Sequence, residues 1–249
     1  MKLFLAGTLS GLDKAFLQSE IEKGVFRLDT FARLDTKTLY FLNDWSDFLL
    51  DSGAFTYFSD PKNKGNIDWD NYIDKYASFI LKHNIKLFFE LDIDSLVGYE
   101  RVKKMRSMLE KKVGRQCIPV WHKSRGLEDF KKMCDDYSYV AIGGLVTKEI
   151  KKADYKILQY LVSLAHSKNA KIHGLGFTIT DVKKFGFDSV DSSSWNVPLR
   201  TGTGVYRFFD KKLNLIKAPA GSRSKCYKQA SKQCFSAWAD YARFLYRQG

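Results

Sequence analysis

Apolar residues fall into short runs along the chain, rich in β-branched and aromatic side chains and separated by polar stretches. The runs are nearly continuous rather than alternating, which is typical of strands buried on both faces of a sheet. We therefore predict strands at Lys2–Ala6, Thr38–Leu42, Phe48–Leu50, Lys86–Leu91, Cys117–Trp121, Tyr139–Ile142, Lys171–Leu175, Phe187–Val190 and Val205–Phe209.

Helical periodicity lies between several of these runs. Asp68 is a candidate N-cap, and the apolar positions after it, through Ile80, recur with i, i+3, i+4, i+7 spacing. Further helices are predicted at 127–134, at 155–165 and near the end of the chain. Alternation of strands and helices over 249 residues favours an α/β fold, a single (β/α)8 TIM-type barrel, over a doubly wound sheet. Residues 1–249 are expected to form one domain, with a basic C-terminal segment at about 207–249.

Three of the predicted strands lead into an aspartate. Asp51 follows the apolar run in LLDSGAF, Asp92 the run in LFFELD, and Asp191 the run in GFDSVDSSSW. Active sites of (β/α)8 barrels form where the strands end, at their C-terminal face. The other residues just past predicted strands are His122, Gly143, Gly144 and Gly176. The sequence therefore predicts that these candidate catalytic and binding residues lie together at the C-terminal rim of the barrel.

Each of these residues also has an ordinary structural explanation. Gly53 permits a sharp turn that would point Asp51 into the barrel mouth, with Phe55 offering a ring face to a planar ligand. Asp51 could equally cap the following turn, with Phe55 in the core. Asp92 could accept two hydrogen bonds from an N–H/NH₂ edge such as that of guanine, or cap a helix. His122 either touches a substrate or forms a structural hydrogen bond.

The glycine turns IGGLV and HGLGF would let a ligand approach the backbone, although a glycine after a strand is often just a turn. Asp94 is expected to be a solvated loop residue. No HExxH, EF-hand or GxSxG motif occurs, so no metal site is predicted. The four cysteines form no CxxC pair, which favours a reduced, cytoplasmic protein. No apolar run reaches the length of a membrane span, so no membrane partner is expected.

Positive charge is concentrated in two segments. The chain has 41 Lys and Arg against 28 Asp and Glu, a net charge of +13. Residues 101–115 carry seven Lys or Arg and one Glu, and residues 207–249 carry ten Lys or Arg and two Asp. Such clustering indicates a polyanionic partner such as nucleic acid, although two solvated helix faces would give the same count.

DSGAF, ELD, IGGL, GLGF and FDSVDS, in this order, resemble the landmarks of the tRNA-guanine transglycosylase family. The chain is most similar to the short relatives that insert 7-deazaguanines into DNA, often phage or bacterial DNA-modification proteins. The resemblance spans roughly residues 5–200 and includes a minor match at AGT, residues 6–8. It implies a (β/α)8 barrel and a pentosyltransferase that exchanges guanine in nucleic acid, DNA favoured over tRNA, for a free 7-deazaguanine.

The resemblance also implies a role for each landmark. Asp191 would be the nucleophile that forms a covalent glycosyl intermediate, and Asp51 would transfer protons, with its pKa raised by burial and by the nearby Asp191. Asp92 would bind the N1–H/N2–H edge of the base. The remaining substrate-binding positions are Ser52, Gly53, Phe55, His122, Gly143, Gly144, Leu145 and Gly176. The free base is a co-substrate, and no cofactor or metal is implied.

The chain departs from the family in three places. The zinc-binding C-terminal extension is missing, the family's V-Q-G turn is replaced by Val120-Trp121-His122, and its P-T-R appears as Pro198-Leu199-Arg200. The basic C-terminal segment would instead hold the phosphate backbone. Candidate contacts are Arg200, Arg223, Lys225 and Lys228. Trp195 or Trp121 could stack on a flipped base, or lie in the core.

Two other classes of function remain open from the sequence. A barrel enzyme acting on a small phosphorylated or glycosidic metabolite would share the carboxylates but would not need two basic clusters. A non-catalytic nucleic-acid-binding paralogue would need the basic clusters but not the three aspartates.

Overall fold

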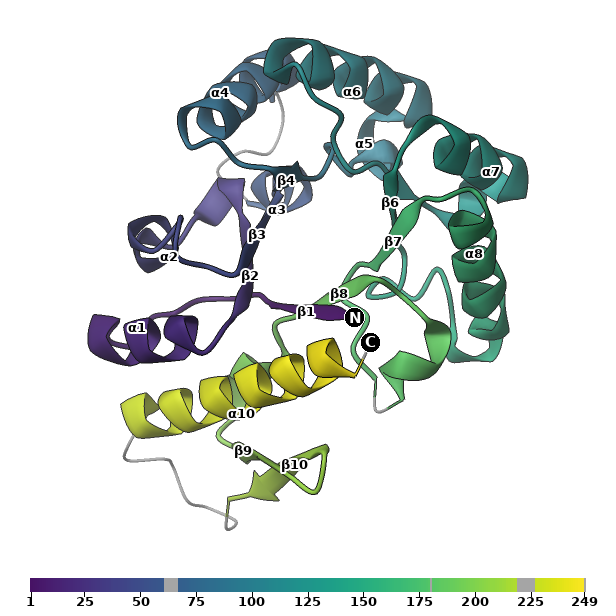
Figure 1. Cartoon of the computed structure of the whole chain (residues 1–249). Coiled ribbons are helices and arrows are strands. Elements are labelled where there is room, and N and C mark those ends of the chain that lie inside the picture. Colours follow the sequence, from purple (N-terminus) through teal and green to yellow (C-terminus); the bar gives the residue numbers. More distant parts are fainter. Residues whose placement is uncertain (61–66, 180, 219–226, 249) are drawn as a thin grey trace. The chain divides into compact units, whose positions relative to one another are not determined.

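The structure is a computed structural model that describes residues 1–60, 67–179, 181–218 and 227–248. Its main sheet has eight strands in the order β4-β3-β2-β1-β8-β7-β6-β5 (Figure 1). A parallel bridge between Phe89 and Ile118 links the segment after β4 to the segment before β5. Every pairing described within the sheet is parallel, and helices follow most strands, so the chain has the (β/α)8 TIM-type fold.

Contacts group the chain into two compact units. Unit 1 comprises residues 1–28, 35–47 and 176–249, and unit 2 comprises residues 29–34 and 48–175. The elements of unit 1 are β1 (Lys2–Leu5), α1 (Lys14–Glu22), the start of β2 (Phe26–Thr30), α2 (Thr36–Tyr40), β8 (Ser189–Ser192), α9 (Val197–Thr201), β9 (Gly204–Phe209), β10 (Lys212–Lys217) and α10 (Tyr227–Arg247). The elements of unit 2 are most of β3 (Asp47–Asp51), α3 (Ala54–Ser59), α4 (Trp69–Lys82), β4 (Leu87–Phe88), α5 (Asp94–Val97), α6 (Tyr99–Val113), β5 (Val120–Trp121), α7 (Gly126–Asp136), β6 (Tyr139–Ile142), α8 (Lys156–Ser167) and β7 (Lys171–Gly174). The expectation of one domain stays a prediction.

Most predicted elements are confirmed near their predicted bounds. The strand predicted at Tyr139–Ile142 is β6, and the Asp68 side chain caps α4 by accepting a hydrogen bond from the Asn71 N–H. The last strand of the barrel is shifted. It runs from Ser189 to Ser192, so that Asp191 lies within β8 rather than after it.

The strand predicted at Thr38–Leu42 is wrong. Residues Thr36–Tyr40 form α2, capped by Asp35, and the strand that occupies this place in the sheet is β2. β2 escapes detection because it carries Arg27, which is fully buried. Its guanidinium donates to the carbonyls of Leu5 and Gly7 and to the Thr38 hydroxyl, so the buried cation is satisfied by long-range contacts that periodicity does not reveal.

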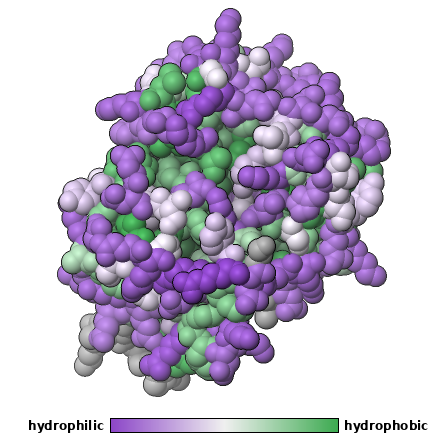
Figure 2. Space-filling view, in the orientation of Figure 1, coloured by the Kyte–Doolittle hydropathy of each residue, from purple (hydrophilic) through white to green (hydrophobic). Residues whose placement is uncertain are grey.

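Unit 1 carries a two-stranded antiparallel ribbon, β9 and β10, after the barrel strands. The ribbon packs on α10, with Tyr206 against Trp238 and Phe208 against Tyr241 (Figure 1). Some apolar ribbon residues remain exposed, among them Phe209 and Ile216. Figure 2 shows an apolar area over the ribbon, at the lower edge of the face.

Unit 2 buries an ion pair beneath its strands. Glu90 is fully buried and accepts hydrogen bonds from Arg106 Nε at 2.7 Å, Arg106 Nη2 at 3.3 Å and the Val120 N–H at 2.6 Å. Arg106 comes from α6, so this member of the basic 101–115 segment is structural rather than a contact for a polyanion. Within the part of the chain that the structure describes, no helix has an apolar stretch long enough to cross a bilayer.

Candidate active site

The predicted residues lie where the barrel strands end. Asp51 is the last residue of β3, His122 directly follows β5, and Gly143 directly follows β6. Asp92 lies four residues after β4, and Asp191 is the penultimate residue of β8. Asp51 and Asp92 belong to unit 2, and Asp191 belongs to unit 1.

In unit 2 the structure brings together His122 and two carboxylates. The His122 Nε2 atom lies 2.7 Å from Asp92 Oδ1, and its Nδ1 atom lies 2.9 Å from Glu149 Oε2. The other oxygen of Glu149 accepts the Ser124 N–H at 2.8 Å. The histidine side chain is 14% exposed and each carboxylate 29%, so this row of three groups is accessible at the carboxylates. Of the two explanations for His122, the structural hydrogen bond is present.

This arrangement favours the imidazolium form of His122. Burial of the ring opposes the charge, but hydrogen bonds and charge attraction from Asp92 and Glu149 outweigh it and raise the pKa of His122 to about 9. Burial would raise the pKa of Glu149, yet the hydrogen bonds from His122 and Ser124 lower it below its ordinary value. Near neutral pH the row therefore holds a positively charged His122 between the carboxyl groups of Asp92 and Glu149.

The glycine pair after β6 leaves room for this row. A Cβ atom at Gly143 would lie 2.7 Å from the His122 ring, and one at Gly144 would lie 2.7 Å from Glu149 Oε2. Gly144 also has φ +76°, a left-handed conformation that favours glycine. The neighbouring Leu145 is buried. The IGGL turn is thus shaped at least in part by His122 and Glu149.

A second ion pair supports the same edge. Asp94 Oδ2 accepts hydrogen bonds from Arg125 Nε at 3.0 Å and Nη2 at 2.9 Å, and the Arg125 side chain is 4% exposed. The guanidinium stacks on the Tyr99 ring at 4.0 Å. The expectation that Asp94 is a solvated loop residue is therefore wrong, because its carboxylate is held by a nearly buried arginine.

Asp92, Asp94 and His122 also offer ligand atoms within 4.8 Å of one another, a spacing that a metal ion could bridge. The chemistry of the donors disfavours that use. A metal needs neutral imidazole, whereas the pKa of His122 is raised to about 9, and it would compete with Arg125 for Asp94. We therefore interpret the group as an ion network.

The DSGAF segment forms the predicted sharp turn. Gly53 has φ +66°, and a Cβ there would lie 2.1 Å from Thr30 Oγ1. The turn is fixed by tyrosines of α4, with the Tyr72 hydroxyl donating to the Ser52 carbonyl. Burial and then the charge of Asp51 raise the pKa of Tyr72, and the Asp51 side chain is half-buried. The side chain of Phe55, on α3, lies outside the described residues.

In unit 1 the structure joins the GLGF turn to the FDSVDS strand. Asp191 is half-buried, and its Oδ1 atom accepts the Gly176 N–H at 2.7 Å. Gly176 has φ +63°, which aims this N–H at the carboxylate from a turn that suits glycine. The next residue, Ser192, accepts a hydrogen bond from Thr178 at 2.7 Å. One oxygen of Asp191 is thus oriented by a peptide dipole.

The AGT segment after β1 is tied to the loop that follows Asp191. Trp195 Nε1 donates to the Ala6 carbonyl at 2.7 Å, and the Asn196 side-chain amide donates to the Thr8 carbonyl at 3.3 Å. Trp195 is 1% exposed and packs on Phe235. Its role is to hold this loop, so of the two explanations given for it the core explanation applies.

Trp121 is also a core residue. It is 2% exposed, its Nε1 atom donates to the Gly126 carbonyl, and its ring packs on Phe130. Of the residues predicted to contact the phosphate backbone of nucleic acid, Arg200 and Lys228 are exposed on α9 and α10. Arg223 and Lys225 lie outside the described residues.

Sequence reasoning did not find Glu149 or Arg125. Glu149 stands in the polar stretch TKEIKK, where no pattern separates it from solvated charges. Its position soon after the glycine pair was the only available hint. Two adjacent glycines indicate that another side chain packs closely on the turn, and in the structure those side chains are His122 and Glu149. Arg125, close behind His122 in WHKSRG, gave a similar hint.

No family model matches the chain, and no curated protein matches it. Among solved structures, a candidate fructose-1,6-biphosphate aldolase from Coccidioides immitis aligns with 99% of this chain and 89% of its own, with TM-score 0.56 and 11% identity. A structure from Aquifex aeolicus VF5 aligns with 97% of this chain and 93% of its own, with TM-score 0.55 and 10% identity. Likeness at this level of identity concerns the (β/α)8 fold alone.

Proposed function

We propose that the protein is a transglycosylase that exchanges guanine in nucleic acid, DNA ahead of tRNA, for a free 7-deazaguanine base. The observation that supports this most directly is the hydrogen bond from the Gly176 N–H to Asp191, at 2.7 Å. It couples two of the landmarks on which the family resemblance rests, GLGF and FDSVDS, and it orients a half-buried carboxylate at the end of a barrel strand. A nucleophilic carboxylate needs such fixed orientation while it keeps its reactivity.

The reaction balances as two displacements at C1′. The Asp191 carboxylate forms an ester bond to C1′ while the bond from C1′ to guanine N9 breaks, and guanine leaves with a proton on that nitrogen. The corresponding nitrogen of the incoming 7-deazaguanine then loses its proton and attacks C1′, which releases Asp191. Asp51 gives the first proton and takes the second, a role for which its position at the end of β3, on the face where barrel active sites form, is suited.

Recognition of the base falls to the ion network of unit 2. His122, held as imidazolium, contacts Asp92 Oδ1 at 2.7 Å and fixes the direction of this carboxylate. An ionised Asp92 accepts hydrogen bonds from the N1–H and N2–H groups of a guanine-type base. Gly144 and Leu145 read the base carbonyl through the backbone. The partners are nucleic acid and the free base, and the place of action is the cytoplasm, or the host cytoplasm if the protein is phage-encoded.

The test is exchange of radiolabelled guanine into duplex DNA and into tRNA. Asp191→Ala should abolish incorporation and also any covalent protein–nucleic acid adduct, and Asp51→Asn should reduce incorporation strongly. Asp210→Asn is a matched control, because Asp210 is exposed at the ribbon turn with φ +50°, a conformation that asparagine tolerates. If folded wild-type protein exchanges guanine into neither polymer, the proposal is wrong, and small phosphorylated or glycosidic substrates become the next to assay.

A further inference from the structure

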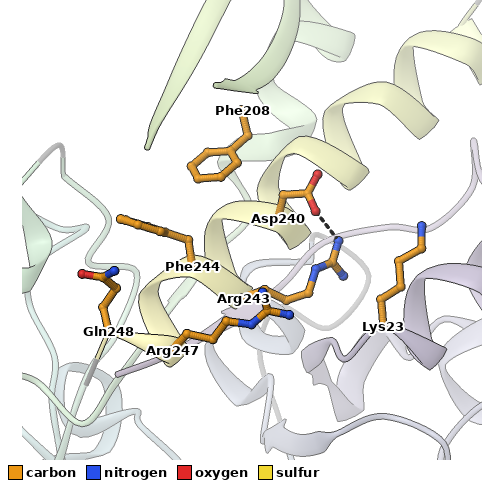
Figure 3. Close-up of a pocket in the computed structure, with 7 residues that line it drawn as sticks. All are labelled: Lys23, Phe208, Asp240, Arg243, Phe244, Arg247 and Gln248. Atoms are coloured by element: carbon orange, nitrogen blue, oxygen red, sulfur yellow. Dashed lines mark hydrogen bonds and ion pairs between the residues drawn. The ribbon is translucent and has the colours of Figure 1, made fainter. Parts of the chain in front are cut away.

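A hollow lies on unit 1 between the ribbon and the C-terminal half of α10 (Figure 3). It has a volume of about 560 Å³. We call it the α10 hollow, and it is lined by Lys23, Phe208, Asp240, Arg243, Phe244, Arg247 and Gln248. In Figure 3 the two phenylalanine rings lie on one side and Lys23 on the other, with the two arginines between them.

Cations at the hollow divide into fixed and exposed groups. Arg243 donates to Glu20 at 3.0 Å, to Asp240 at 2.7 Å and to the Gly24 carbonyl at 3.2 Å, so it is a wall of the hollow. Arg247 is exposed at the last turn of α10. Lys183, exposed on the neighbouring 3-10 turn, places its ammonium 5.4 Å from the centre of the Phe244 ring. Arg247 and Lys183 can thus meet an anion without giving up a buried partner.

Aromatic rings form the apolar side of the hollow. The centres of the Phe208 and Phe244 rings are 5.7 Å apart, with the ring planes tilted by 47°. Both side chains are only partly buried, although a phenylalanine at a ribbon–helix contact would ordinarily be covered. Partly accessible rings beside exposed cations are the two elements by which proteins hold single-stranded nucleic acid, the rings taking bases and the cations taking phosphates.

We propose that the α10 hollow binds a single-stranded segment of nucleic acid, with phosphates against Arg247 and Lys183 and a base against Phe208 and Phe244. A single strand fits better than a duplex, because stacked and paired bases present no free face to a ring. Charge complementarity supports this occupant, since the segment 207–249 carries ten Lys or Arg and two Asp. The choice of nucleic acid rests on the proposed function, whereas the position of the site rests on the hollow itself.

The experiment measures binding of a fluorescein-labelled 20-nucleotide single strand to the full chain by anisotropy, over a series of salt concentrations. Arg247→Glu should weaken binding by about 10-fold or more at 0.1 M salt and flatten the slope of log Kd against log salt by about 0.7 per lost phosphate contact. Phe244→Leu should weaken binding by about 5-fold or more with the salt slope unchanged, because stacking is lost and no charge changes. Thermal melting of each variant checks the fold.

Lys75→Glu is the matched control for charge. Lys75 is exposed on α4 in the other unit and lies outside both basic segments, so this variant changes the net charge equally without touching the hollow. Equal weakening by Arg247→Glu and Lys75→Glu, or unchanged binding by Phe244→Leu, would overturn the site. A duplex of the same sequence that binds as tightly as the single strand would overturn the single-strand assignment, and an RNA strand of that sequence distinguishes the two polymers. Binding that maps to the hollow without any guanine exchange leaves this inference standing while the proposed function fails.

Discussion

The two units hold their strand-end carboxylates in different ways. In unit 2, Asp92 and Asp94 each lie against a cation, His122 for the first and Arg125 for the second. In unit 1, Asp191 is oriented by the Gly176 N–H, a neutral dipole. An ion pair keeps a carboxylate charged and fixed, but it also draws electron density toward the cation. A peptide N–H also orients a carboxylate, but it withdraws less electron density from it than a cation does.

This difference suggests a division of labour in the proposed reaction. A carboxylate that recognises a base must stay ionised and still, which a cation ensures. A carboxylate that attacks carbon must be held in a fixed direction, which the N–H of Gly176 provides at Oδ1 of Asp191.

The largest effect is expected from exchanging carboxylate for amide in each unit. Asp191→Asn should lower the rate of guanine exchange by at least about 10³-fold, because the attacking oxygen is lost. Asp92→Asn should instead raise KM by about 10- to 100-fold, since it removes a charged hydrogen bond to the base. Steady-state measurement of kcat and KM for guanine exchange by both variants distinguishes the two effects. Equal effects on kcat would contradict the division of labour.

The ion pair beneath unit 2 should matter most for folding. Arg106→Leu leaves Glu90 buried without its cation and should reduce the free energy of unfolding by about 3–5 kcal/mol, as measured by urea titration. Adding Glu90→Gln should recover at least half of the loss, because an amide oxygen can still accept the Val120 N–H. No recovery in the double variant would mean that packing rather than charge sets the cost.

The His122 network predicts a pH dependence. The pKa of His122 is raised from 6.5 in the unfolded chain to about 9 in the fold, so its stabilisation is fully present below pH 6.5 and is lost as the pH rises through about 9. The shift corresponds to at most about 3 kcal/mol. His122→Gln should therefore destabilise the protein at pH 6 and much less at pH 10, in urea titrations of both proteins. An equal difference at the two pH values would show that the network is not ionic.

The smallest effect is expected at the glycine pair. Gly144→Ala should lose about 1–2 kcal/mol from the left-handed backbone, plus a further cost from the contact with Glu149, which a Cβ would approach to 2.7 Å. Gly114→Ala is the matched control, because Gly114 has φ +72° and no neighbour within 4 Å of a Cβ. Only Gly144→Ala should also lower the pKa of His122 in NMR titration. If both variants lose the same stability and the pKa of His122 does not shift, Gly144 is not needed to position Glu149 against His122.

Local pattern was sufficient for much of the barrel. Continuous apolar runs located β3 and β6, and i, i+3, i+4 spacing located α4 and α8, because a buried strand or an amphipathic helix records its environment in consecutive residues. The aspartates at strand ends followed from the same pattern. The DSG turn was also readable, since Gly53 adopts the left-handed backbone that its place after a strand indicated.

Tertiary structure alone decided which groups meet. Arg27 hid β2 because its charge is satisfied by carbonyls about 20 residues earlier, and Asp92 and Glu149 reach His122 from 30 and 27 residues away in opposite directions. The α10 hollow likewise joins Lys23 to Arg247 across nearly the whole chain. The sequence by itself determined where charges and turns would stand along the barrel strands. The fold chose their partners, because hydrogen bonds and ion pairs depend on distance in space, which periodicity along the chain does not encode.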